Sequence, residues 1–133
     1  MTKKANFDKF QKEWNEDNVE AKRFHWLTKD KIINEMEIKI ISKLPIKESH
    51  KILEVGCGEG QNIYNLKKRH KKAKFYGIDM AKNRIEFAKT KINDAIFSTQ
   101  DGRKIEYKDN TFDIVFCRDV IHHMSTNRQK FIK

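Results

Sequence analysis

Short apolar runs alternate with amphipathic stretches along the last two thirds of the chain. The runs with the length and composition of strands are 51–55, 74–78, 95–99 and 112–117, and the stretches with helical spacing of apolar residues are 61–70 and 81–93. Strands that alternate with helices of this length are typical of βαβ units and a parallel sheet. The run 114–117 is apolar at every position, as in strands buried on both faces. We therefore predict an α/β fold with a Rossmann-like parallel sheet sandwiched by helices.

The first third of the chain has helical spacing instead. The apolar positions that carry it are Phe7, Phe10 and Trp14, and then Ile33, Met36, Ile40 and Leu44, with Asp30 available as an N-cap. Pro45, the only proline, separates the two patterns. We predict an extension of two or three amphipathic helices over 1–45 and a Rossmann-like domain over 46–133. An amphipathic helix must bury its apolar face, so the extension should pack on the domain, and the aromatic cluster Phe24-His25-Trp26 suggests a lid.

Composition narrows the function classes. The chain has 133 residues and a formal net charge of +10, which suits one domain. Its longest apolar runs are far shorter than the ~18 residues of a membrane-spanning helix, so we expect a cytoplasmic protein with no membrane partner. Cys57 and Cys117 lie far apart and outside any Cys-x-x-Cys pattern, which argues against disulfides and metal sites. Only 67–72 is densely basic, so solvated lysines are favoured over a nucleic-acid surface.

A glycine-rich turn follows the first predicted strand and leads into a helix. Gly56, Gly58 and Gly60 permit positive φ and a close approach of a ligand to the backbone, and the helix that follows offers unpaired amides. Asp79 ends the second predicted strand, where a carboxylate can accept hydrogen bonds from ribose hydroxyls. The pattern indicates a ligand that contains a nucleoside.

The spacing of the glycines separates two families. The dinucleotide fingerprint G-x-G-x-x-G/A would require Gly or Ala at position 61, where this chain has Gln61. The segment 54–60 instead resembles the first motif of class I S-adenosylmethionine-dependent methyltransferases. The segment 105–115 is similar to the run that leads into the fourth strand of the family's small-molecule ("type 11") branch, and 117–124 resembles the end of that strand. The resemblance implies S-adenosylmethionine as the cofactor.

The resemblance also assigns roles. It implies that Glu54 reaches the methionine end of the cofactor, that Asp79 and Met80 face the ribose and adenine, and that the acid of Gln100-Asp101-Gly102 approaches the adenine amino group. The predicted cofactor-binding residues are Glu54, Gly56, Cys57, Gly58, Gly60, Asp79, Met80, Asp101, Gly102 and Arg118, and His122 and His123 are candidate general bases. Plainer interpretations remain: Asp79 and Asp101 could cap a helix or turn, Cys57 could simply fit the turn, and Asp113 is expected to fix a turn.

The length limits what the chain holds. The resembled fold has seven strands, and at ~30 residues per βα unit it needs on the order of 200 residues. We therefore expect an N-terminal portion, with strands 1 to 4, of a methyltransferase for a small-molecule acceptor. The sequence lacks both the Asn/Asp-Pro-Pro-Tyr motif and the Pro-Cys motif of nucleic-acid methylases. The alternatives are an RNA methyltransferase, a non-catalytic S-adenosylmethionine-binding module that self-associates through the exposed edge of the fourth strand, and a nicotinamide-dependent oxidoreductase.

Overall fold

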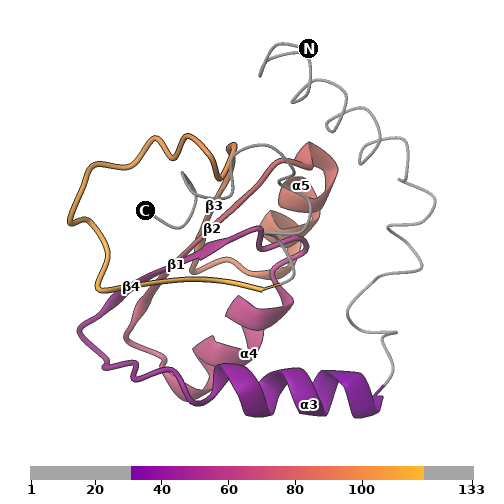
Figure 1. The fold of residues 1–133 in the computed structure, drawn as a ribbon. Helices are drawn as coiled ribbons and strands as arrows, with labels where there is room; N and C mark the ends of the chain where they lie inside the picture. The colour runs from indigo at the N-terminus through magenta and orange to yellow at the C-terminus, as the bar shows by residue number, and fades with distance from the viewer. Residues whose placement is uncertain (1–30, 119–133) are drawn as a thin grey trace.

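The computed structural model describes residues 31–118, which form a parallel sheet with helices packed on it (Figure 1). In chain order the elements are α3 (Lys31–Ile41), β1 (Lys51–Val55), α4 (Gln61–Arg69), β2 (Lys74–Asp79), α5 (Lys82–Lys91), β3 (Ile96–Thr99) and β4 (Ile114–Cys117). The α/β prediction is confirmed, and each predicted strand and helix after Pro45 lies within two residues of an observed one at both ends. No helix among residues 31–118 is long and apolar enough to cross a bilayer.

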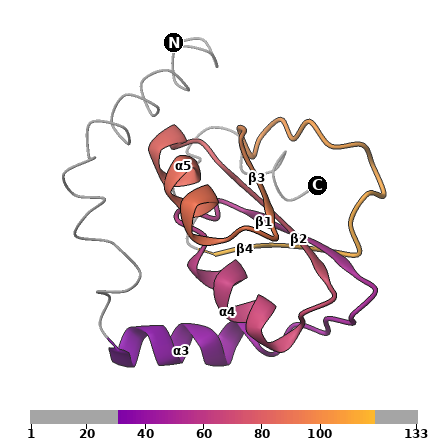
Figure 2. The same cartoon turned by 180° about the vertical axis from the view of Figure 1, so that it is seen from behind.

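The four strands are parallel and run in the order β3-β2-β1-β4. Val55 at the end of β1 pairs with Ile78 on one side and with Cys117 on the other, and Asp79 pairs with Thr99. The carboxyl ends of all four strands therefore meet at one edge, where ligands of open α/β sheets bind. Figure 2 shows the sheet from the other side.

Among residues 31–118, the helices α3, α4 and α5 pack on one face of the sheet. The core on the covered face includes Ile52, Phe75, Ile63 and Ile85, which come from β1, β2, α4 and α5. Right-handed crossovers place both helices on the same side, because β1, β2 and β3 follow one another in one direction across the sheet. The connection from β3 to β4 returns over the other face as an irregular segment, 100–113.

This segment is held on the sheet by three aromatic rings. Tyr76 of β2 meets Tyr107 edge-on at 5.8 Å and Phe112 at 5.0 Å between ring centroids, and Tyr107 meets Phe112 at 5.0 Å. Edge-on pairs at these distances are favourable. Gln100 fixes the start of the segment, since its Nε2 donates to Ser98 Oγ at 2.8 Å and its Oε1 accepts the Glu106 amide at 3.0 Å. Asp101 and Gly102 therefore follow directly after a residue that hydrogen bonds hold in place.

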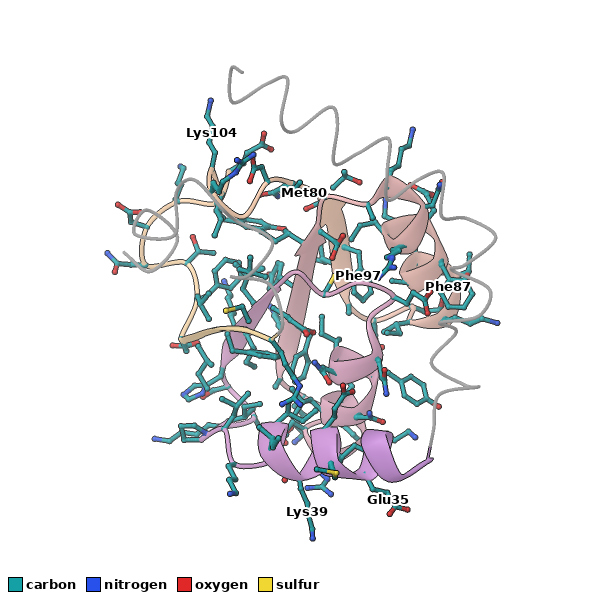
Figure 3. The ribbon with its side chains drawn as sticks, turned by 45° about the vertical axis from the view of Figure 1, so that its right-hand side comes forward. Glu35, Lys39, Met80, Phe87, Phe97 and Lys104 are labelled. Atoms are coloured by element: carbon teal, nitrogen blue, oxygen red, sulfur yellow. The ribbon has the colours of Figure 1, made fainter. Side chains whose placement is uncertain are left out.

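The buried face of α3 differs from the predicted one. Met36 and Ile40 are 59% and 50% exposed, whereas Ile41 is 4% exposed and joins the core with α4. Leu44 lies beyond the end of the helix and is partly buried against the same core. Figure 3 shows Glu35 and Lys39 projecting from the outer side of α3. The helix therefore packs on the domain, as expected, but turned so that Ile41 contacts it.

Several predicted features lie outside the described residues. They are Phe7, Phe10, Trp14, the lid cluster 24–26, the cap Asp30, the candidate bases His122 and His123, and the side chain of Ile33.

Neighbouring isoleucines of α3 provide a matched test of its orientation. Ile41→Ala should lower the free energy of unfolding by about 2 to 4 kcal/mol, because it removes buried methylene groups and leaves a cavity. Ile40→Ala should change it by less than about 0.5 kcal/mol, because that side chain is half exposed. Urea unfolding followed by circular dichroism measures both. Equal losses in the two variants would contradict the observed orientation.

Candidate functional site

The carboxyl edge of the sheet gathers most of the predicted site residues. The glycine turn 56–60 follows β1, Asp79 ends β2 with Met80 directly after it, Asp101 follows β3, and Arg118 follows β4. Figure 3 shows Met80 beyond the end of β2 and Lys104 on the segment after β3, at the same end of the sheet. The parallel topology alone brings these distant positions together.

All three glycines of the turn have the left-handed conformation predicted for them. Their φ angles are +75° at Gly56, +56° at Gly58 and +85° at Gly60. The Gly56 and Cys57 amides both donate to the Ile78 carbonyl, at 2.8 and 3.0 Å, which ties the turn to β2. Gly60 is the N-cap of α4, so the unpaired amides of that helix's first turn lie at the same edge.

The glycines differ in what surrounds them. A Cβ at Gly58 would meet only Arg84 Nη1, at 3.9 Å, so this backbone has room for a ligand to approach it. A Cβ at Gly60 would lie 2.9 Å from Ile92 Cδ1, and one at Gly77 in β2 would lie 2.8 Å from Cys57 Sγ. Gly77 was not singled out from the sequence. Glycine inside a strand often marks such a close approach.

Asp79 binds the turn directly. Its Oδ2 accepts the Gly58 amide at 2.9 Å and its Oδ1 accepts the Ala81 amide at 2.8 Å. The hydrogen bond from the Gly58 amide fixes the glycine turn to the end of β2. The hydrogen bond from the Ala81 amide is the helix-capping role that the sequence analysis left open. Together they engage both oxygens of the carboxylate.

Glu54 is the most deeply buried acid of the described chain, with 2% of its surface exposed. Its Oε1 accepts a hydrogen bond from Asn62 Nδ2 in the first turn of α4, at 2.9 Å. Buried carboxylates need such partners. Sequence reasoning missed Asn62; the signal for it was a polar residue in the first turn of the helix that follows the glycine turn.

Two carboxylates, Asp79 and Glu54, act on the thiols at this edge although the chain's net charge is +10. Burial raises the pKa of the Cys57 thiol well above its ordinary value, and the charges of Asp79 and Glu54 raise it further. Burial and Glu54 also raise the pKa of Cys117 at the end of β4. Carboxylates that disfavour a thiolate also favour a cation nearby. The surroundings of these two thiols therefore favour a positively charged ligand group.

The raised pKa of Cys57 predicts an unreactive thiol. Only the thiolate is nucleophilic, and a pKa above the ordinary value keeps Cys57 protonated at pH 8. In Cys117→Ser, we expect reaction of Cys57 with Ellman's reagent to be at least ten times slower in the folded protein than in urea. Cys57→Ser, which leaves the partly exposed Cys117, should react faster when folded. Rapid labelling of folded Cys57 would contradict the buried, negative environment.

The remaining predicted residues have varied surroundings. Asp101 is bound by Arg103, which sequence reasoning missed, with a shortest distance of 2.7 Å from Nη2 to Oδ2. Arg118 Nε lies 4.0 Å from Glu37 Oε1 of α3, across a loose ion pair. Asp113 lies at the opposite edge, where its Oδ2 accepts the Lys51 amide at 2.8 Å. Asp113 therefore fixes the start of the β1–β4 pairing, where the sequence predicted that it would fix a turn.

The chain is similar to known methyltransferases. The profile of a family described as "Methyltransferase domain" matches residues 53–133. A phosphoethanolamine N-methyltransferase of Plasmodium falciparum is 30% identical over 99 residues, 71% of this chain and 37% of that protein. Phosphoethanolamine N-methyltransferase 3 of Arabidopsis thaliana is 34% identical over 93 residues, 65% of this chain and 18% of that protein. The chain thus spans well under half the length of these curated relatives.

Solved structures also resemble it. An S-adenosylmethionine-dependent methyltransferase from Aquifex aeolicus has a TM-score of 0.60 at 28% identity, over 74% of this chain and 54% of that one. Phosphoethanolamine N-methyltransferase 2 of Haemonchus contortus, solved in complex with S-adenosyl-L-methionine, has a TM-score of 0.63 at 25% identity, over 72% of this chain and 24% of that one.

Proposed function

The chain belongs to the class I S-adenosylmethionine-dependent methyltransferase family, and on that premise we propose that its carboxyl edge binds S-adenosylmethionine for methyl transfer to a small-molecule acceptor. The observation that carries the proposal is the pairing of the glycine turn with Asp79, through the 2.9 Å hydrogen bond from the Gly58 amide. The open space beside Gly58 and the nearby carboxylates fit a cationic nucleoside.

Each residue of the site has a defined part in this proposal. Asp79, at the end of β2 and bound to the glycine turn, binds the ribose hydroxyls. Glu54, held by Asn62, offers negative charge to the methionine end. The bound cofactor supplies a sulfonium whose methyl group is transferred in line to an acceptor nucleophile. The chain's contribution is to hold the two reactants in line, which can account for several kcal/mol of the barrier.

An amine-bearing small molecule is the acceptor class that we propose. Both curated relatives described above are named phosphoethanolamine N-methyltransferases, which supports an amine as the methylated group. RNA is the alternative that the net charge of +10 leaves open. Transfer of radiolabelled methyl to phosphoethanolamine and to tRNA, by the full chain, compares the two. Methylation of tRNA alone would overturn this acceptor class.

Calorimetry of the full chain tests the cofactor. We expect binding of S-adenosylmethionine and S-adenosylhomocysteine and none of NAD, because Gln61 stands where the dinucleotide fingerprint requires Gly or Ala. Binding of NAD without S-adenosylmethionine would overturn the proposal in favour of an oxidoreductase. Binding of neither would overturn it as well.

Self-association through β4 is the second candidate property. In the described sheet β4 has a neighbour on one side only, and its Val115 is 55% exposed. Unpaired strand edges of this kind template pairing with another strand, and a second copy of the chain offers an identical one. Light scattering should show a dimer that Val115→Lys weakens. A monomer at all concentrations would contradict this candidate.

A further inference from the structure

The segment after β3 contains a closed ion pair between Asp101 and Arg103. Arg103 Nε donates to Asp101 Oδ1 and Oδ2 at 3.0 and 3.1 Å, and its Nη2 donates to Oδ2 at 2.7 Å. The Arg103 backbone amide donates to Oδ1 at 2.9 Å. The two side chains are only 9% and 21% exposed, with the arginine the deeper. A guanidinium fork and an amide from one residue thus enclose one carboxylate.

These contacts engage both oxygens of Asp101. A carboxylate has about four lone-pair sites, and three N–H groups of Arg103 point at them: the backbone amide at Oδ1, Nη2 at Oδ2, and Nε–H shared between the two. The oxygens of Asp79 accept the backbone amides of Gly58 and Ala81, whereas those of Asp101 are enclosed by an arginine side chain.

The ion pair is also the stronger competitor for Asp101. The guanidinium is charged and binds both oxygens of the carboxylate, whereas the amino group of adenine is a neutral donor that would give Asp101 a single hydrogen bond. Releasing Arg103 would leave a buried guanidinium without its counter-charge. The pair closes a turn as well, since the Lys104 amide donates to the Asp101 carbonyl at 2.9 Å.

We propose that Arg103 is a positioning residue that keeps Asp101 in a closed ion pair, so that Asp101 shapes the adenine end of the site and does not itself accept the adenine amino group. The inference rests on the proposed function, because it concerns the base of S-adenosylmethionine. It differs from the role that the family resemblance gives to Asp101. Recognition of the amino group is then weak in this chain, and Arg103 is the cause.

The test compares S-adenosylhomocysteine with its 6-deamino purine analogue, which lacks only the amino group. In calorimetry with the full chain, we expect the two affinities to agree within about threefold. Arg103→Met should release the Asp101 carboxylate and create a preference of at least tenfold for the amino compound, and Arg103→Lys should create a smaller one. Lys104→Met, the removal of an exposed neighbouring cation, should create none.

A preference of threefold or more in the unaltered chain, removed by Asp101→Asn, would overturn the inference. So would Arg103→Met without any new preference. A merely structural role would change both affinities equally, whereas the ratio reports on the amino group alone.

A ligand-free measurement keeps the inference separate from the proposed function. The Arg103 Nε–H signal in ¹⁵N NMR spectra, identified by its loss in Arg103→Lys, should exchange slowly with solvent and stay unshifted when S-adenosylhomocysteine is added. Fast exchange, or loss of the signal on addition, would overturn the closed pair. Failure of both compounds to bind would instead contradict the proposed function and leave the NMR result to decide on the pair.

Discussion

Gly60→Ala is expected to lower the free energy of unfolding by about 2 to 5 kcal/mol. A non-glycine residue at φ +85° loses about 1 to 2 kcal/mol to the left-handed conformation. The added Cβ would also lie 2.9 Å from Ile92 Cδ1 and 3.2 Å from Phe97 Cζ, and overpacking of a core costs a further ~1 to 3 kcal/mol. Urea unfolding of the full chain measures the sum.

Gly58→Ala is the matched control. Its φ of +56° carries the same conformational cost, but its Cβ would meet only Arg84 Nη1 at 3.9 Å. We expect a loss of only about 1 to 2 kcal/mol, together with weaker binding of S-adenosylhomocysteine, because the methyl group fills the space beside the turn. Equal losses of stability in Gly58→Ala and Gly60→Ala would contradict the close packing around Gly60.

The order of strands and helices after Pro45 could be predicted because it is encoded locally. A buried strand and an amphipathic helix have different hydrophobic periods, and the glycine turn marks where one becomes the other. The orientation of α3 could not be predicted, because Lys31–Ile41 has apolar residues on several sides of the helix. Only the contact with α4 decides that Ile41 is buried and Met36 and Ile40 are exposed.

The segment that follows β3 illustrates the same limit. Residues 100–113 have no helical period, and the sequence alone did not show that they would pack on the sheet. Tyr76, Tyr107 and Phe112 hold them there through contacts between residues as many as 36 positions apart. Such contacts depend on the folded topology and not on local spacing.

Some features of the candidate site could also be predicted from the sequence, and others could not. The conformations of the glycine turn and the position of Asp79 follow from a local motif, and the structure has both. Asn62 and Gly77 depend on what lies across a turn or a strand, and no spacing rule indicates them. Cofactor contacts of Cys57, Met80, Gly102 and Arg118 remain predictions, as do the roles of His122 and His123.

Asp79→Asn is expected to weaken binding of S-adenosylhomocysteine about 10- to 100-fold. Hydrogen bonds to a charged acceptor contribute about 1.5 to 3 kcal/mol each, and a loss of 1.4 kcal/mol is tenfold in affinity. The amide of asparagine retains an acceptor for the Gly58 amide but lacks the second charged oxygen. Calorimetry measures the loss, and circular dichroism checks that the fold persists.

Asp113→Asn is the matched control, because it makes the same change at the opposite edge of the sheet. Its carboxylate accepts the Lys51 amide at 2.8 Å, so the variant should lose some stability and keep its affinity. The 2′-deoxy analogue of S-adenosylhomocysteine sharpens the comparison. If Asp79 binds the ribose, the unaltered chain should discriminate against the analogue and Asp79→Asn should discriminate less, because the two changes remove the same hydrogen bond. Independent, additive losses would mean that Asp79 acts only by holding the glycine turn.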